Sequence, residues 1–310
     1  FEELFFFSCG LRRLRQRRAE VSGPACRDVD MAPFYSALPF SLTGAQQKAI
    51  GEALADMRAE RPMNRLCQGD VGSGKTVVAA ACVYFAVKNG WQAALMAPTE
   101  ILARQHYQNL ASLFEALHLR CALLTGSTPA RQRRQLLQQL SAGEIDLCIG
   151  THALLTEDVQ YQRLGLVITD EQHRFGVDQR AALSAKAENP HMLVLSATPI
   201  PRTLALMIYG DLDVSVIDEL PPGRQKVDTF AVDESYRPRL NAFIRKQVKE
   251  GRQVYIVCPM VQENDEMPDE RKAVTAYAKA LQKEVFTELR IRLLQRKMKK
   301  RKKEAVMVAF

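Results

Sequence analysis

A glycine-rich stretch has the residue types and the spacing to bind a phosphate chain. Residues 69–76 read Gly-Asp-Val-Gly-Ser-Gly-Lys-Thr and fit the pattern G-x-x-x-x-G-K-[ST] at every fixed position. Glycines let the backbone turn several N–H groups toward one phosphate chain. Lys75 would reach the β- and γ-phosphates and assist catalysis, and the hydroxyl of Thr76 would bind Mg²⁺. The predicted nucleotide-binding residues are Gly69, Asp70, Val71, Gly72, Ser73, Gly74, Lys75 and Thr76.

A pair of acidic residues follows an apolar run further along the chain. Leu164–Ile168 is apolar, and residues 169–173, Thr-Asp-Glu-Gln-His, come directly after it. A carboxylate at the end of a buried strand can hold the Mg²⁺ that bridges phosphates, and a neighbouring carboxylate can activate the attacking water. We assign Asp170 to the metal and Glu171 to the water. The candidates for sensing the γ-phosphate are Gln172 and His173.

Three polar residues outside these motifs are further candidates. Gln46 lies upstream of the glycine-rich stretch, and its amide could hydrogen-bond the edge of an adenine base. Ser196 and Thr198 follow the apolar run His191–Leu195. Their hydroxyls are candidates for relaying hydrolysis to a bound polymer.

The elements that must position these residues alternate between strands and helices. The glycine-rich stretch lies between a predicted strand, Met63–Gln68, and a predicted helix, Val77–Val87. Further strands are predicted at Gln92–Ala97, Arg120–Leu124 and Ile145–Ile149, and further helices at Glu100–Leu117 and Ala130–Leu140. This rhythm predicts an α/β fold with a parallel, doubly wound sheet flanked by helices. Ligands of such sheets bind beyond the carboxyl ends of the strands, where the candidate residues also fall.

The two ends of the chain have different predicted organisation. Leucines at helical spacing predict a helix over residues 1–20, followed by a linker-like stretch at Ser22–Pro39. Thr43 is the predicted cap of a helix over Ala45–Met57. A second domain is predicted to contain strands at Lys226–Val232, Gln253–Cys258 and Leu289–Leu294 and helices at Tyr236–Glu250 and Arg271–Lys283. The predicted domains are therefore 1–39, 40–224 and 225–310.

Composition limits the class of protein. With 47% hydrophobic and 25% charged residues among 310, the chain is globular, and no apolar run is long enough to span a membrane. The seven cysteines include no C-x-x-C pair, which favours a reduced cytosolic protein over a zinc site. Between Glu288 and Glu304 nine basic and two acidic residues give +7, which is nearly the whole net charge of +8, and a second basic cluster lies at Arg12–Arg18. Each run is either a nucleic-acid contact or a solvated helix face.

The motifs, taken in order, resemble those of superfamily 2 helicases. The residues that carry the resemblance are Gln46, residues 69–76, Ala97–Ala103, Thr125–Ser127, Gly150–Leu155, Asp170–His173 and Ser196–Thr198. Within that superfamily the chain is most similar to the RecG-type DNA helicases. The residues that carry this closer resemblance are Asp170–Val177, Ala197–Leu204 and Tyr209–Arg224. The transcription–repair coupling factor shares Arg174–Val177 and Pro199–Leu204. The resemblance covers essentially all of residues 40–290.

The resemblance implies a fold and an activity. The fold would be a RecA-like P-loop NTPase domain followed by an incomplete second RecA-like domain, with an N-terminal helical arm. The activity would be that of an ATP-dependent DNA helicase, using ATP and Mg²⁺ to remodel branched double-stranded DNA by fork reversal and Holliday junction branch migration during recombination and repair. Such a protein would be a monomer in the bacterial cytoplasm. The implied DNA-facing residues are Thr99, Arg104, Gly126, Thr151 and His152.

Two alternatives remain open at this stage. Later motifs of the second RecA-like domain, including an arginine that completes the ATP site, are not visible in the sequence, and neither is the family's amino-terminal wedge domain. This leads us to expect a fragment with impaired activity, or one that only binds nucleotide or DNA. The other alternative is a double-stranded DNA translocase like the transcription–repair coupling factor. Gln172 favours the RecG type, because the coupling factor typically has Glu there.

Overall fold

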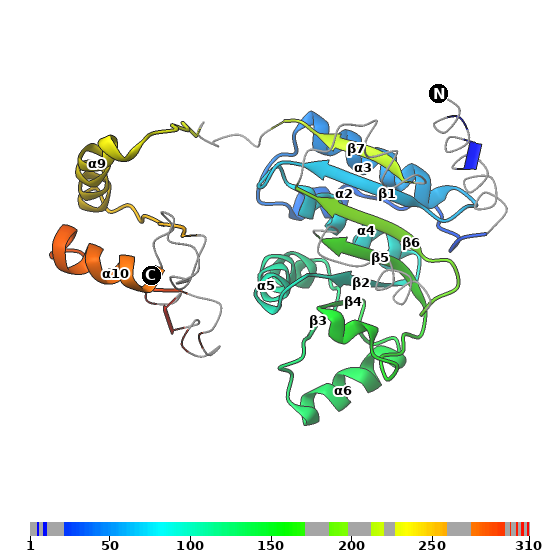
Figure 1. Cartoon of the computed structure of the whole chain (residues 1–310). Coiled ribbons are helices and arrows are strands. Elements are labelled where there is room, and N and C mark those ends of the chain that lie inside the picture. Colours follow the sequence, from blue (N-terminus) through cyan, green and yellow to red (C-terminus); the bar gives the residue numbers. More distant parts are fainter. Residues whose placement is uncertain are drawn as a thin grey trace. The chain divides into compact units, whose positions relative to one another are not determined.

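The computed structural model divides the chain into two compact units, residues 1–225 and 226–310 (Figure 1). It describes residues 22–170, 186–197, 212–219, 227–258 and 274–294, together with residues 5, 9, 10, 298, 302, 305, 306 and 309. The helix predicted over residues 1–20 therefore lies almost wholly outside the described residues. Each unit is described by itself below.

The first unit contains a seven-stranded sheet with the strand order β3-β4-β2-β5-β6-β1-β7 (Figure 1). The strands are β1 Asn64–Gly69, β2 Gln92–Met96, β3 Cys121–Leu124, β4 Leu147–Gly150, β5 Leu164–Asp170, β6 His191–Ser196 and β7 Asp213–Ile217. Every neighbouring pair is parallel. The central strands β2, β5 and β6 are buried along their whole length, as strands covered on both faces should be. The structure thus confirms the predicted parallel α/β fold.

Helices connect these strands. They are α2 Ala32–Ala37, α3 Gly44–Arg58, α4 Lys75–Lys88, α5 Glu100–Ala116 and α6 Ala130–Ser141, with a short 3₁₀ turn, η1, at His152–Leu155. Thr43 caps α3 as predicted, because its side chain accepts from the N–H of Gln46 while the Gln46 side chain accepts from the N–H of Thr43. No helix in the described part of the chain is long and apolar enough to cross a membrane.

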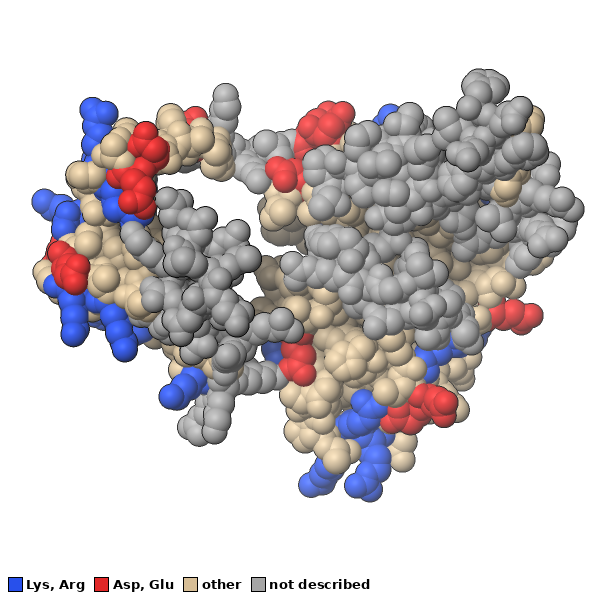
Figure 2. Space-filling view, in the orientation of Figure 1, with Lys and Arg blue, Asp and Glu red and all other residues tan. Residues whose placement is uncertain are grey.

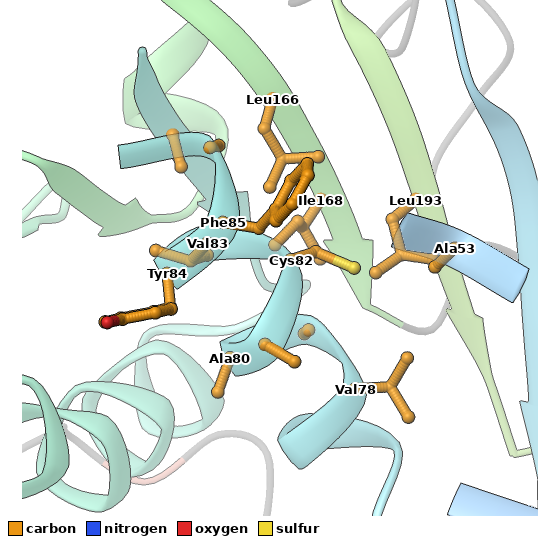
Figure 3. Close-up of a cluster of buried hydrophobic side chains, with 14 of the residues drawn as sticks. Ala53, Val78, Ala80, Cys82, Val83, Tyr84, Phe85, Leu166, Ile168 and Leu193 are labelled. Carbon is orange, nitrogen blue, oxygen red and sulfur yellow. The ribbon is translucent and has the colours of Figure 1, made fainter. Parts of the chain in front are cut away.

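Helix α4 is the centre of the core. Residues Val77 to Ala86 are all buried, which is typical of a helix covered on every side. Figure 3 shows Phe85 and Cys82 of α4 beside Leu166 and Ile168 of β5. Because α4 begins at the glycine-rich stretch, this packing fixes the stretch against the sheet.

The segment before α3 corresponds to the predicted linker-like stretch. Phe34 of α2 is fully buried, and Cys26 is also buried against the first unit. The backbone carbonyls of Pro24 and Ala25 accept hydrogen bonds from His191 Nε2, at 3.0 Å, and from Trp91 Nε1, at 3.2 Å. This stretch is therefore an ordered segment that packs on the core of the first unit, and its role as a linker between domains stays a prediction.

The second unit forms the predicted helices but not the predicted strands. Its elements are η3 Glu234–Tyr236, α9 Arg237–Lys249, α10 Val274–Ala280 and the π-helical turn η4 Leu281–Val285. Residues 227–232, 253–258 and 291–294 contain no strand. Among the described residues, the buried core of this unit consists of Ile244, Leu281 and Phe286. Phe230 and Val257 are 81% and 90% exposed, and no strand among the described residues of this unit pairs with these β-type sequences.

The cysteines are free thiols without disulfides. Burial raises the pKa of Cys67 and Cys148 to about 12, so both thiols stay protonated near neutral pH. Since only the thiolate is a strong nucleophile, these side chains act as small apolar core residues.

Candidate functional site

The glycine-rich stretch forms a tight loop between β1 and α4. Gly72 and Gly74 have φ angles of 78° and 92°, which side chains rarely adopt. The N–H of Ser73 donates to the carbonyl of Asp70 at 3.1 Å, which closes the turn. The loop therefore curls immediately before the N-terminus of α4, and this arrangement is typical of phosphate-binding sites.

Lys75 lies over this loop. Its Nζ donates to the carbonyls of Gly69, at 2.7 Å, and Asp70, at 2.8 Å. Thr76 follows on the first turn of α4 and is partly exposed. The ammonium group and the hydroxyl are thus both at the end of the loop where the helix begins.

Gln46 supports the loop from α3. Its Nε2 donates to the carbonyl of Ser73 at 2.8 Å, its Oε1 accepts from Thr43, and only 2% of the residue is exposed. The sequence did not reveal this supporting contact, because it joins residues on two separate elements. The predicted contact with an adenine base is not tested by these hydrogen bonds and stays a prediction.

Asp170 lies at the same edge of the sheet as the loop. It is the last residue of β5, and β5 is separated from β1 by a single strand, β6. Two strand spacings are about 10 Å, which one nucleotide with its metal ion can bridge. Ser196, the last residue of β6, pairs with Gln68 of β1 and so ends between the two groups. Four predicted site residues, Glu171, Gln172, His173 and Thr198, lie outside the described residues.

A histidine that the sequence analysis missed contacts Asp170. His106 of α5 places Nε2 2.7 Å from Asp170 Oδ2, and both residues are at most 9% exposed. The signal was present in the sequence as a histidine on the apolar stripe of α5, whose buried residues are Ala103, His106, Leu110 and Phe114. A buried polar side chain needs a hydrogen-bond partner, but the fold determines which residue that partner is, so the sequence alone does not identify it.

Three of the predicted DNA-facing residues lie around the start of α5. Thr99 caps the helix by accepting from the N–H of Leu102 at 3.3 Å. Arg104 donates to Ser127 Oγ at 3.4 Å, and Ser127 also donates to the carboxylate of Glu100. These contacts join α5 to the loop that contains Gly126. The structure therefore gathers Thr99, Arg104 and Gly126 on one exposed part of the first unit.

The remaining two predicted DNA-facing residues follow β4. His152 begins η1 and is exposed, whereas Thr151 is 2% exposed, so its side chain does not reach the surface. Basic side chains gather over α6, which follows the Gly126 loop (Figure 2). They include Arg131, Arg133 and Arg134, of which Arg133 pairs with Asp158 at 2.8 Å. This basic surface was not singled out from the sequence, because the terminal basic runs dominate the charge.

Comparison with known proteins identifies the family. A model of the DEAD/DEAH box helicase family matches residues 43–207, which include the glycine-rich loop and Asp170. The chain belongs to this family. Its glycine-rich loop and its acidic strand end therefore lie in the part of the chain that matches this family.

Relatives and solved structures narrow the comparison within the DEAD/DEAH box helicase family. The ATP-dependent DNA helicase RecG of a Synechocystis species is 49% identical over 313 residues, which cover 100% of this chain and 37% of that protein. RecG of Bacillus subtilis is 48% identical over 280 residues, or 89% of this chain and 41% of that protein. A structure of RecG bound to a three-way DNA junction matches 99% of this chain and 40% of its own length, with a TM-score of 0.80 and 39% identity. The chain thus spans less than half the length of these relatives.

A more distant structure shares the fold alone. The DEAD-box helicase Mss116 bound to single-stranded RNA has a TM-score of 0.55 and 18% identity. The match covers 72% of this chain and supports its fold.

Proposed function

We propose that this chain contains the nucleotide-binding part of an ATP-dependent DNA helicase of the RecG type, which couples ATP hydrolysis to the remodelling of branched DNA. The observation that carries the proposal is the location of the Lys75 loop and Asp170 at one edge of the sheet, separated by one strand. The similarity to RecG over the whole chain supports the same function.

The residues at this edge fit a nucleotide with Mg²⁺. Backbone N–H groups of the loop and the ammonium of Lys75 would hold the phosphates, and Gln46 would keep the loop in shape. The hydroxyl of Thr76 and the carboxylate of Asp170 are hard oxygen ligands of the kind that Mg²⁺ prefers. When bound, Mg²⁺ neutralises charge on the phosphates. Glu171 would orient the attacking water, and Gln172 and His173 would contact the γ-phosphate.

DNA would bind over the exposed residues at the start of α5 and over the basic residues of α6. Arg104 and the basic residues of α6 suit contacts with DNA phosphates, which position a duplex without reading its sequence. Hydroxyl groups of Thr99, Ser196 and Thr198 would help to couple DNA contact to hydrolysis. We further propose that the chain acts as a monomer in the bacterial cytoplasm. Its proposed domains are an arm at 1–39, a first RecA-like domain at 40–224 and part of a second at 225–310.

The proposal is tested by ATP hydrolysis with and without a three-way DNA junction. We expect slow hydrolysis by the full chain that the junction accelerates. Lys75→Ala should lower the rate by about 100-fold, because it removes a preorganised cation from the developing charge. The exposed Lys48→Ala, on α3, is the matched control and should retain the wild-type rate.

Two results would contradict the proposal. Equal nucleotide affinity of the wild type and Lys75→Ala, measured with a fluorescent ATP analogue, would remove the phosphate-binding role of the loop. Nucleotide binding without hydrolysis, whether or not DNA is present, would favour a fragment that only binds nucleotide.

A further inference from the structure

A buried histidine connects the proposed metal ligand to a neighbouring helix. His106 Nε2 lies 2.7 Å from Asp170 Oδ2, a distance typical of a strong hydrogen bond to a charged acceptor. Because an ionised carboxylate only accepts, the histidine donates from Nε2. Among the described residues no side chain or backbone group donates to the other oxygen, Oδ1.

The surroundings of His106 are apolar. It is 8% exposed and lies on the same stripe of α5 as Ala103 and Leu110, which belong to the main core. A polar pair in such a core costs free energy of desolvation, and an apolar pair of the same volume is often as stable. Core packing alone therefore gives no reason for this pair, whereas a requirement for one fixed carboxylate orientation does.

We propose that His106 is a positioning residue, which holds Oδ2 of Asp170 and so leaves Oδ1 as the oxygen that binds Mg²⁺. This inference rests on the proposed function, because it assumes that Asp170 binds the metal of a bound nucleotide. Hydrogen bonds from outside the metal shell fix the orientation of ligands in this way, and their removal typically weakens metal binding by about 10- to 100-fold.

The test compares two amide side chains of different length. Gln at position 106 can place its Nε2 near the histidine Nε2, whereas Asn reaches only about as far as the histidine Nδ1. The measurement is the Mg²⁺ concentration that half-saturates binding of a fluorescent, non-hydrolysable ATP analogue to the full chain. His106→Asn should raise this concentration by about tenfold. His106→Gln should remain within about twofold of the wild type, since it keeps the donor.

Two controls separate positioning from folding. Gln108→Leu changes an exposed residue of the same helix and should leave both the Mg²⁺ requirement and the thermal unfolding midpoint unchanged. Nucleotide affinity in EDTA should be equal for all four proteins, because the phosphate-binding loop is untouched.

Several outcomes would overturn the proposal. Equal Mg²⁺ requirements of His106→Asn and the wild type would show that the hydrogen bond does not act on the metal. Equal increases in both amide variants, or a His106→Gln protein that unfolds while Gln108→Leu folds, would show that the ring is needed for packing instead. A wild-type protein whose nucleotide binding is independent of Mg²⁺ and of Lys75 would overturn the proposed function, and this inference with it.

Discussion

Gly74 has a conformation and a close contact that a larger residue would disturb. Its φ angle is 92°, and a Cβ at this position would lie 2.2 Å from Nε2 of Gln46. A methyl group would strain the backbone and would also push the Gln46 amide away from the Ser73 carbonyl. Both effects act on the same loop.

We therefore expect Gly74→Ala to lower the free energy of unfolding by about 1–3 kcal/mol and to weaken nucleotide binding. Urea unfolding and a fluorescent-nucleotide titration measure the two effects. Gly51→Ala is the matched control, because Gly51 is helical and has open space around its Cβ. It should be neutral or slightly stabilising. Equal changes in unfolding free energy and nucleotide affinity for the two substitutions would show that the positive φ of Gly74 has no special role in stability or binding.

Residue type and spacing predicted some site residues better than others. The places of the loop residues and of Asp170 in the fold were predictable, because a fixed pattern and a strand end define them locally, while their roles stay predictions. The partners of Gln46 and Asp170 were not, because those contacts join residues 27 and 64 positions apart. Which residues meet at such distances depends on how helices α3 and α5 pack on the sheet.

Among the elements, β6 provides an anchor far from the site. His191 begins this strand and is fully buried, with Nδ1 accepting from the Met63 N–H at 2.9 Å and Nε2 donating to the Pro24 carbonyl at 3.0 Å. Burial lowers the pKa of His191 from 6.5 to about 4. The imidazole is therefore neutral in the folded protein near neutral pH, and it joins β6 to Met63, which directly precedes β1, and to the segment before α2.

This burial predicts a loss of stability in acid. Between pH 6.5 and about 4 the unfolded chain binds a proton at His191 that the folded chain does not, so the free energy of unfolding falls as the pH falls. The full loss is about 3 kcal/mol, and it ends below the folded pKa. In urea unfolding at several pH values, His191→Asn should flatten this slope, because Asn does not titrate.

The exposed His118→Asn is the control, since Asn tolerates the positive φ of 57° at that position. It should leave the slope unchanged. An identical slope in the wild type and His191→Asn would show that other groups cause the acid sensitivity.

Whether a predicted strand formed depended on whether another strand was available to pair with it. In the first unit every predicted strand is found, because each apolar run has at least one neighbouring strand of the sheet to pair with. In the second unit the β-type run at 253–258 contains no strand, and Val257 is 90% exposed. Helices α9 and α10 formed where predicted, since helical hydrogen bonds are local and strand hydrogen bonds are not.

At the scale of the whole molecule, the two units differ in how much apolar surface they bury. The first unit buries residues Val77 to Ala86 of α4 and the whole of strands β2, β5 and β6, whereas the described core of the second unit is small. All of the described site residues belong to the first unit. We therefore propose that this unit holds one Mg²⁺–nucleotide between the Lys75 loop and Asp170.

A crystal structure of the full chain with Mn²⁺ and a non-hydrolysable ATP analogue tests this claim most directly. Anomalous scattering locates the metal without assuming where it binds. We predict one strong peak about 2 Å from the Thr76 hydroxyl, with the Asp170 carboxylate bound to the metal directly or through one water. A nucleotide bound away from residues 69–76, or a metal that approaches neither Thr76 nor Asp170, would contradict the account.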